Sequence, residues 1–166
     1  QQISEAVSIP IMIQDAPLSG VSLSVDLLVR MAHELDGVSC FKIEMPGTAD
    51  KLRKLIESGG SAIEGPFDGE ESITLMADLD AGATGTMPSA MIPDLIKPVV
   101  EHHLAGRRKQ AAEQYGKILP LINYENRQCG LRATKALMLE GGVITSDRVR
   151  HPMPALPTES RKGLLE

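Results

Sequence analysis

Short apolar runs alternate with amphipathic segments at a nearly constant spacing over the first half of the chain. The predicted strands begin near residues 9, 38, 61 and 84, so successive strands start 29, 23 and 23 residues apart. Between them, apolar residues recur at helical spacing in residues 22–35, 48–58 and 70–81. Because a connecting helix returns the chain to the end of the sheet where the previous strand began, consecutive strands must be parallel. The sequence therefore predicts an α/β fold in which helices cover a parallel sheet.

The alternation of strands and helices stops after residue 89. Residues 91–104, 107–121 and 128–139 are predicted to form successive helices. Three prolines, Pro152, Pro154 and Pro157, indicate an irregular stretch before a short tail. We therefore predict two regions, a strand–helix region over residues 1–89 and a helical region over residues 90–166.

Charge and composition narrow the kinds of partner that this chain can have. With 166 residues, of which 42% are hydrophobic and 23% charged, it is long and apolar enough to form a single core. The net charge is −5 and there is no basic tract, which argues against nucleic acid or an anionic membrane as a partner. No apolar run approaches the roughly 20 residues that a membrane-spanning helix needs.

The two cysteines, Cys40 and Cys129, have neither a CxxC spacing nor the histidine-rich spacing of a metal site. Cys40 lies inside a predicted strand, where a buried free thiol is the ordinary case. Because free thiols are typical of a reducing compartment, we expect this protein to be cytoplasmic.

The second predicted strand, residues 38–44, places a lysine and a glutamate on the same face. Alternate residues of a strand share a face, so Lys42 and Glu44 point the same way, about 7 Å apart for a rise of roughly 3.3 Å per residue. A lysine in an apolar strand is costly unless its charge is lost or paired, and a neutral amine can attack a carbonyl carbon. A lone lysine at a strand end is more often solvated. The pattern nevertheless predicts that this strand is the centre of the site.

Polar side chains are also predicted at the ends of the other strands. Gln14 closes the first apolar run, Glu64 closes the third, and Thr86 lies in the fourth. Parallel α/β folds build their sites at the carboxyl edge of the sheet, where these strand ends meet. Together with Lys42 and Glu44, these residues predict a polar pocket at that edge.

Several short motifs carry the same residues. They are Gln-Asp-Ala-Pro at residues 14–17, Phe-Lys-Ile-Glu at 41–44, Glu-Gly-Pro-Phe-Asp at 64–68, and Gly-Ala-Thr-Gly-Thr-Met-Pro-Ser at 82–89. Lys-Ala-Leu at residues 135–137 and an arginine at 148 followed by His-Pro-Met-Pro lie in the helical region. In this order they resemble the motifs of the dihydrodipicolinate synthase and N-acetylneuraminate lyase family, whose members form a Schiff base with a lysine. The resemblance spans nearly the whole chain.

The resemblance implies a TIM (β/α)8 barrel of which this chain carries roughly the last four βα units, followed by a C-terminal helical extension. The strand-two loop that binds the substrate carboxylate in the family has no counterpart in these residues. We therefore expect this chain to be half of a barrel or part of a longer polypeptide. Family members are usually dimers or tetramers, so a homo-oligomer is implied.

Two departures from the family pattern concern proton transfer. Gln14 stands where the family has a tyrosine, and an amide cannot act as an acid or base near neutral pH. The loop at residues 17–20 also lacks the arginine of the lysine-biosynthetic synthases. Glu44, which shares a face with Lys42, would take over the proton transfers. The combination of Gln-Asp-Ala-Pro with Lys-Ile-Glu resembles the branch of the family that dehydrates 2-keto-3-deoxy sugar acids. The resemblance implies L-2-keto-3-deoxyarabonate as the most specific candidate substrate and 2,5-dioxopentanoate as the product.

The resemblance also implies residue roles. Lys42 would condense with the C2 ketone, Glu44 would remove a C3 proton and assist departure of the C4 hydroxyl, and Gln14 would orient the reacting groups. The implied substrate-binding residues are Glu64, Gly65 and Thr86. Neither a metal nor an organic cofactor is implied, because the lysine imine is the electron sink.

The sequence leaves alternatives open. An aldolase would use the same Lys42 imine but break a carbon–carbon bond, giving pyruvate and an aldehyde. A catalytically inactive half barrel would have only a structural or assembly role. Glu44 could also be a simple ion-pair partner of Lys42, since such pairs arise structurally as well.

Overall fold

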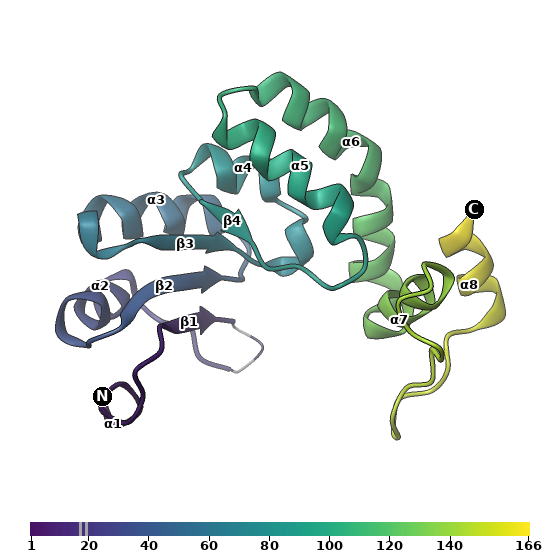
Figure 1. Ribbon diagram of the computed structural model, residues 1–166, viewed down its shortest axis with the longest axis horizontal. Coiled ribbons are helices and arrows are strands. Elements are labelled where there is room, and N and C mark those ends of the chain that lie inside the picture. Colours follow the sequence, from purple (N-terminus) through teal and green to yellow (C-terminus); the bar gives the residue numbers. More distant parts are fainter. Residues whose placement is uncertain (17, 19) are drawn as a thin grey trace.

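The computed structural model describes residues 1–16, 18 and 20–166. Four parallel strands form one sheet in which the spatial order equals the sequence order, as Figure 1 shows. This arrangement confirms the predicted α/β class and parallel sheet. The strands are β1 (Ile11–Asp15), β2 (Val38–Ile43), β3 (Gly65–Asp68) and β4 (Gly85–Thr86).

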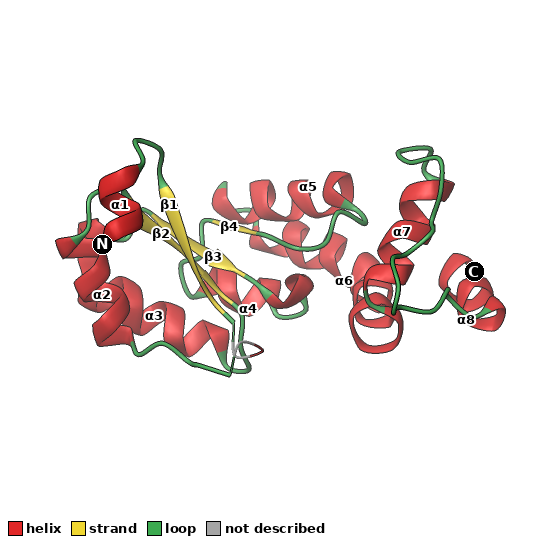
Figure 2. Cartoon of the chain, turned by 90° about the horizontal axis from the view of Figure 1, so that it is seen from below, coloured by secondary structure: helices red, strands yellow, loops and turns green. Residues whose placement is uncertain are grey.

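Helices that connect the strands lie along one face of the sheet (Figure 2). The helix after β1 begins at Ser24, whose hydroxyl accepts a hydrogen bond from the amide of Leu27 at 3.2 Å. This bond satisfies one of the backbone donors that are unpaired at the start of a helix. The connecting helices are α2 (Val25–Glu34), α3 (Thr48–Gly59) and α4 (Leu75–Asp80), and the short helix α1 (Gln2–Ala6) precedes β1.

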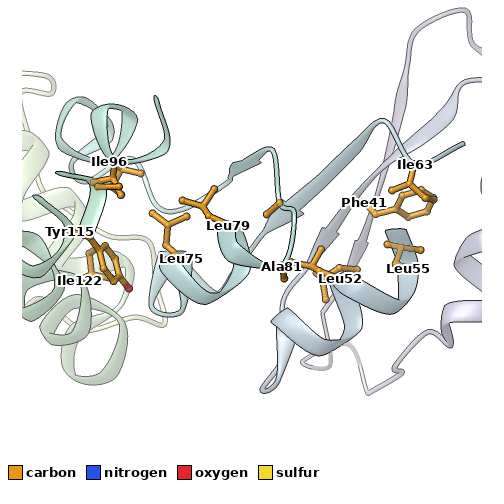
Figure 3. Packing of buried hydrophobic residues seen from close by; sticks show 14 of the residues in the cluster. Phe41, Leu52, Leu55, Ile63, Leu75, Leu79, Ala81, Ile96, Tyr115 and Ile122 are labelled. Atoms are coloured by element: carbon orange, nitrogen blue, oxygen red, sulfur yellow. The ribbon is translucent and has the colours of Figure 1, made fainter. Parts of the chain in front are cut away.

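The hydrophobic core lies between the sheet and these helices. Phe41 and Ile43 of β2 are fully buried, as are Leu52 and Leu55 of α3, and Figure 3 shows Phe41 beside Leu55 and Ile63. Burial of each such side chain stabilises the fold by about 1.5–3 kcal/mol. Because side chains alternate along a strand, the core position of Phe41 and Ile43 places Lys42 on the other face of the sheet.

The third strand begins four residues later than predicted, so the expected strand at residues 61–64 is wrong. A 3₁₀ turn, η2 (Gly60–Ala62), occupies the first half of that segment. Gly65 and Pro66, a residue pair that is typical of turns, belong to β3. A Cβ at Gly65 would lie 2.7 Å from both Cys40 Sγ and a Phe67 ring carbon. The glycine is therefore needed for packing on this face rather than for a turn.

The helix predicted over residues 70–81 is shorter than expected. A separate turn, η3 (Glu70–Ser72), precedes α4. All three residues of η3 have positive φ angles, which are incompatible with a continuous right-handed helix. Residues that are distant in the sequence hold this turn.

The predicted helical region follows β4. Its order is confirmed: α5 (Pro93–Leu104), α6 (Arg108–Tyr124), a π-helical turn η4 (Glu125–Cys129), α7 (Leu131–Glu140) and α8 (Thr158–Leu165). The last helix lies in the tail and was not predicted. Side chains of α5 and α6 join the main core, whereas Cys129, Ala133, Ala136 and Leu164 form a second cluster. The α7 and α8 helices lie beyond the end of α6, away from the sheet (Figure 1). The division at residues 89 and 90 stays a prediction.

Within residues 1–16, 18 and 20–166, no helix combines the length and the apolar character that crossing a lipid bilayer requires.

Candidate active site

Three side chains predicted for the site converge at the carboxyl ends of β1 and β2. The amine Nζ of Lys42 lies 2.9 Å from Oε2 of Glu44. The amide Nε2 of Gln14 donates a hydrogen bond to the same oxygen at 2.6 Å. The side chains of Lys42 and Glu44 are only 15% and 20% exposed, so water screens this ion pair less than a surface pair. One carboxylate oxygen is therefore shared by a potential nucleophile and a neutral donor.

The register of the parallel strands brings these residues together. Gln14 is directly opposite Lys42, although 28 residues separate them in the sequence. The amide of Glu44 donates to the carbonyl oxygen of Asp15 at 2.9 Å, which extends the β1–β2 pairing past the end of β2. The prediction that the ends of these two strands bring Gln14, Lys42 and Glu44 close together is therefore confirmed.

A buried ion pair anchors the end of β1 to α3. The Asp15 side chain accepts hydrogen bonds from Lys51 Nζ at 2.5 Å and from the amide of Leu23 at 2.9 Å, and Lys51 also donates to the carbonyl oxygen of Leu23. Breaking such a buried pair by removing one partner typically costs about 3–5 kcal/mol. The pair therefore fixes the strand end that carries Gln14.

A cleft of about 420 Å³ lies beside Glu44. Its size is in the range that suits a small ligand. The Arg127 guanidinium and the Glu70 carboxylate, which both line the cleft, form an ion pair of 2.7 Å. The lining residues are Leu18, Glu44, Met45, Pro46, Glu70, Asn126 and Arg127.

Thr86 lies at the carboxyl edge as predicted, but its hydroxyl is part of a buried network. It donates to Oδ2 of Asp68 at 2.5 Å and lies 2.7 Å from the hydroxyl of Ser72. Burial, and a hydrogen bond with Asp78, raise the pKa of Asp68 to about 9, so this carboxyl group holds a proton at neutral pH. The predicted substrate contact of Thr86 stays a prediction.

The expected position of Glu64 and Gly65 at the carboxyl edge is wrong. Glu64 precedes β3, and Gly65 is the first residue of that strand. The Glu64 carboxylate accepts a hydrogen bond from Ser39 Oγ at 2.7 Å, near the start of β2. Parallel strands begin at the edge opposite to Lys42. The residue that ends β3 is Asp68, and the error follows from the misplaced third strand.

Three residues near Glu44 were not among those predicted for the site. Gly69 follows β3 directly, and an Asp-Gly pair after an apolar run is a signal that could have indicated this strand end. Glu70 and Arg127 line the cleft but are 57 residues apart, and no local pattern connects them. Pro17 of the first motif, and Ser19 in the loop after it, lie outside the described residues.

The acidic residues after β3 do not gather into a metal site. In the described part of the chain, no group of three or more His, Cys, Asp or Glu side chains is placed to hold a metal ion. His103 instead pairs with Asp80 at 2.9 Å, as does Arg108 at 2.6 Å. Mainly because of the Arg108 hydrogen bonds, the pKa of Asp80 falls to about 2. These contacts connect α4, α5 and α6 on the surface.

Comparison with known proteins gives consistent matches. The family model of the dihydrodipicolinate synthetase family matches residues 1–166. The chain is 57% identical over 164 residues to L-2-keto-3-deoxyarabonate dehydratase of Azospirillum brasilense, covering 99% of this chain and 53% of the relative. It is 28% identical over 166 residues to 4-hydroxy-tetrahydrodipicolinate synthase 2 of Streptomyces coelicolor, covering 98% of this chain and 53% of that protein. The chain thus spans about half the length of the curated relatives it matches.

A solved structure matches the fold. The crystal structure of dihydrodipicolinate synthase from Rhodopseudomonas palustris superposes with a TM-score of 0.87 at 26% identity, covering 98% of this chain and 56% of that chain. The match confirms the predicted fold class, because this α/β chain forms about half of a TIM barrel.

Proposed function

Because the chain belongs to the dihydrodipicolinate synthetase family, we propose that it carries the Schiff-base half of a lyase that dehydrates a 2-keto-3-deoxy sugar acid. The proposed substrate is L-2-keto-3-deoxyarabonate, and the proposed product is 2,5-dioxopentanoate. The 57% identity to a dehydratase of that substrate supports this choice over a synthase, to which identity is 28%.

The observation that carries the proposal is the single oxygen Oε2 of Glu44, which lies 2.9 Å from Lys42 Nζ and 2.6 Å from Gln14 Nε2. Dehydration needs a nucleophile and a proton carrier within reach of adjacent carbon atoms. Lys42 and Glu44 meet this need from one strand end. Gln14 cannot titrate, so its contribution is to orient the carboxylate.

The first half of the reaction forms the imine. Lys42 loses a proton to solvent water, and its neutral amine attacks the C2 ketone of the substrate. The resulting carbinolamine takes up a proton from solvent and loses water, which gives an iminium ion and leaves Glu44 as a carboxylate. The positive charge of this ion acidifies the C3 protons, since it accepts the electron pair left on C3.

The second half is the elimination. Glu44 removes one C3 proton and the electron pair forms an enamine. The protonated Glu44 then donates that proton to the C4 hydroxyl, which departs as water while the enamine electrons form the C3–C4 double bond. Hydrolysis releases Lys42, and tautomerisation of the product gives the aldehyde of 2,5-dioxopentanoate. The imine is the electron sink, so we propose no metal or organic cofactor.

We also propose where the carboxylate-binding groups of the whole protein come from, how it assembles and where it is located. The groups that bind the substrate carboxylate would come from polypeptide that corresponds to the other half of the relatives. We propose a homo-oligomer, a dimer or a tetramer, acting on a small-molecule substrate. The free thiols of Cys40 and Cys129 support a cytoplasmic location.

Borohydride reduction in the presence of substrate tests the proposal. In the whole protein that contains this chain, we expect a covalent mass increase at Lys42, detected by peptide mass spectrometry. The Lys42→Arg variant should show no adduct and should lose at least about a thousandfold in kcat, as expected for loss of a nucleophile. The variant Lys54→Arg, at an exposed position of α3, is the matched control.

The products distinguish the alternatives. Formation of 2,5-dioxopentanoate supports the dehydratase, whereas pyruvate as the main product would establish an aldolase that uses the same lysine. Absence of any adduct at Lys42 would contradict both enzymatic functions and leave a structural role.

A further inference from the structure

The turn that follows β3 has an uncommon backbone. Glu70, Glu71 and Ser72 have φ angles of 48°, 57° and 66°. Residues other than glycine rarely adopt this left-handed region, and three in succession require the surrounding structure to hold them. Contacts with distant segments of the chain hold this turn.

A tyrosine from the helical region holds the end of the turn. The hydroxyl of Tyr115, in α6, donates to the carbonyl oxygens of Ser72 at 2.7 Å and of Ile73 at 2.5 Å. Tyr115 is buried in the core, where Figure 3 shows its ring beside Ile122. On the sheet side, the Ser72 hydroxyl lies 2.7 Å from that of Thr86. The end of the turn is therefore held between α6 and β4.

Side chains of the turn make further contacts. Glu70 pairs with Arg127 of η4 at 2.7 Å. The Glu71 carboxylate accepts a hydrogen bond from the amide of Ser89, in the segment after β4. Each residue of the turn thus has a partner from a different segment of the chain, which accounts for the persistence of its backbone conformation.

The beginning of the turn lies against the proposed proton carrier. A Cβ placed at Gly69 would lie 2.7 Å from Glu44 Cβ, 2.8 Å from the carbonyl oxygen of Ile43 and 3.0 Å from Glu44 Cα. These distances are too short for any side chain, so Gly69 allows the turn to reach the backbone of Glu44. The position of the turn therefore limits where Glu44 can lie.

We propose that Tyr115 and Gly69 are positioning residues for Glu44. Tyr115 holds the left-handed turn in place, and the turn, through Gly69, holds the Cα and Cβ of Glu44 where its carboxylate meets Lys42 and Gln14. This inference rests on the proposed function, because it assumes that Glu44 transfers protons. It adds that two residues that act through the backbone of Glu44 affect the efficiency of that transfer.

Two pairs of variants in the whole protein test the proposal. Tyr115→Phe removes the hydroxyl but keeps the ring, and Tyr124→Phe is its control, since the Tyr124 hydroxyl donates to Ser160 at 3.4 Å, away from the site. Gly69→Ala introduces the conflicting Cβ. Its control is Gly116→Ala, because a Cβ at Gly116 would meet nothing within 4 Å.

Two measurements separate positioning from folding. Borohydride trapping at Lys42 reports imine formation, and exchange of the C3 protons with deuterium, measured together with kcat, reports proton transfer by Glu44. We expect Gly69→Ala and Tyr115→Phe to slow exchange and turnover about tenfold or more, because misplacement of a reacting group by 1 Å can cost about a hundredfold. The trapped adduct should be unchanged, and both controls should stay within about twofold of the original protein.

A double substitution completes the test. In a Glu44→Gln background, Gly69→Ala should reduce the residual exchange no further, since its effect acts through Glu44. A loss of adduct in proportion to kcat, full activity of both variants, or multiplying effects in the double variant would overturn the positioning role. If the original protein forms no adduct, or if Glu44→Gln dehydrates normally, the proposed function fails instead.

Discussion

Two acidic side chains, Glu44 and Asp68, lie at the ends of neighbouring strands of the sheet but face opposite sides of it. On one side, the Glu44 carboxylate is 20% exposed and lies 2.9 Å from the Lys42 amine. On the other side, Asp68 is fully buried and shares a hydrogen bond with a second acid, Asp78. Glu44 therefore has a cation as its neighbour, whereas Asp68 has another carboxyl group.

The two-residue period of a strand explains the difference. Gln14, Lys42 and Phe67 are neighbours in register and face away from the helices. The next position along each strand faces the helices, so Asp68 and Thr86 meet Ser72 and Asp78 there. Burial raises the pKa of Asp68 to about 9, and the group becomes a neutral hydrogen-bonding residue. The end of a strand does not by itself make a carboxylate reactive, because the face decides its environment.

The largest expected effect separates the two carboxyl groups by chemistry. Glu44→Gln should lower kcat by about a hundredfold or more, the usual contribution of a general acid–base group, because an amide cannot carry the proton. Imine trapping at Lys42 should stay largely intact. Steady-state kinetics and borohydride trapping in the whole protein measure the two quantities. Normal turnover would mean that Glu44 is only an ion-pair partner.

An intermediate effect concerns stability on the helix-facing side. Because the folded state holds a proton on Asp68 up to about pH 9 and the unfolded chain releases it near pH 4, this group stabilises the fold less as pH rises between these values. Asp68→Asn removes that proton uptake while keeping a donor toward Asp78. The free energy of unfolding of this variant, minus that of the original protein, should therefore rise with pH by up to about 1.4 kcal/mol per pH unit.

Urea unfolding at pH 5, 7 and 8 checks this expectation. The matched control is Asp50→Asn, at an exposed position of α3 where the carboxylate forms an ion pair with the surface residue Arg53. The control should follow the pH dependence of the original protein. Parallel stability curves for Asp68→Asn and the original protein would show that Asp68 is ionised in the fold.

The smallest expected effect concerns the residue whose position was predicted wrongly. Glu64 lies at the amino end of β3 and contacts Ser39. We expect Glu64→Gln to change kcat and KM by no more than about twofold, because surface substitutions away from special features usually have small effects. A tenfold increase in KM would instead place this side chain in the substrate pocket and remove the contrast between the two edges of the sheet.

Much of the fold was predictable because its signals are local. The spacing of apolar residues indicated the order of strands and helices, and the parallel sheet followed from the short connections. The convergence of Gln14 and Lys42 followed from strand periodicity and from the common direction of the strands. The third strand was misplaced because Gly65 and Pro66 resemble a turn, whereas the glycine makes room for the Cys40 thiol and the Phe67 ring.

What only the tertiary structure decided depends on contacts between distant segments. The turn at residues 70–72 is held by Tyr115, 43 residues after Ser72, and Gly69 meets Glu44 across two strand ends. The neutral state of Asp68 depends on its burial beside Asp78.

The sequence by itself determined the class of fold and the placement of Gln14, Lys42 and Glu44 on one side of the sheet, because apolar periodicity and strand alternation act over a few residues. The tertiary structure decided which carboxyl group stays neutral and which glycine sets the position of Glu44. These properties arise from desolvation and close packing, which depend on every segment that surrounds the group rather than on its neighbours in the chain.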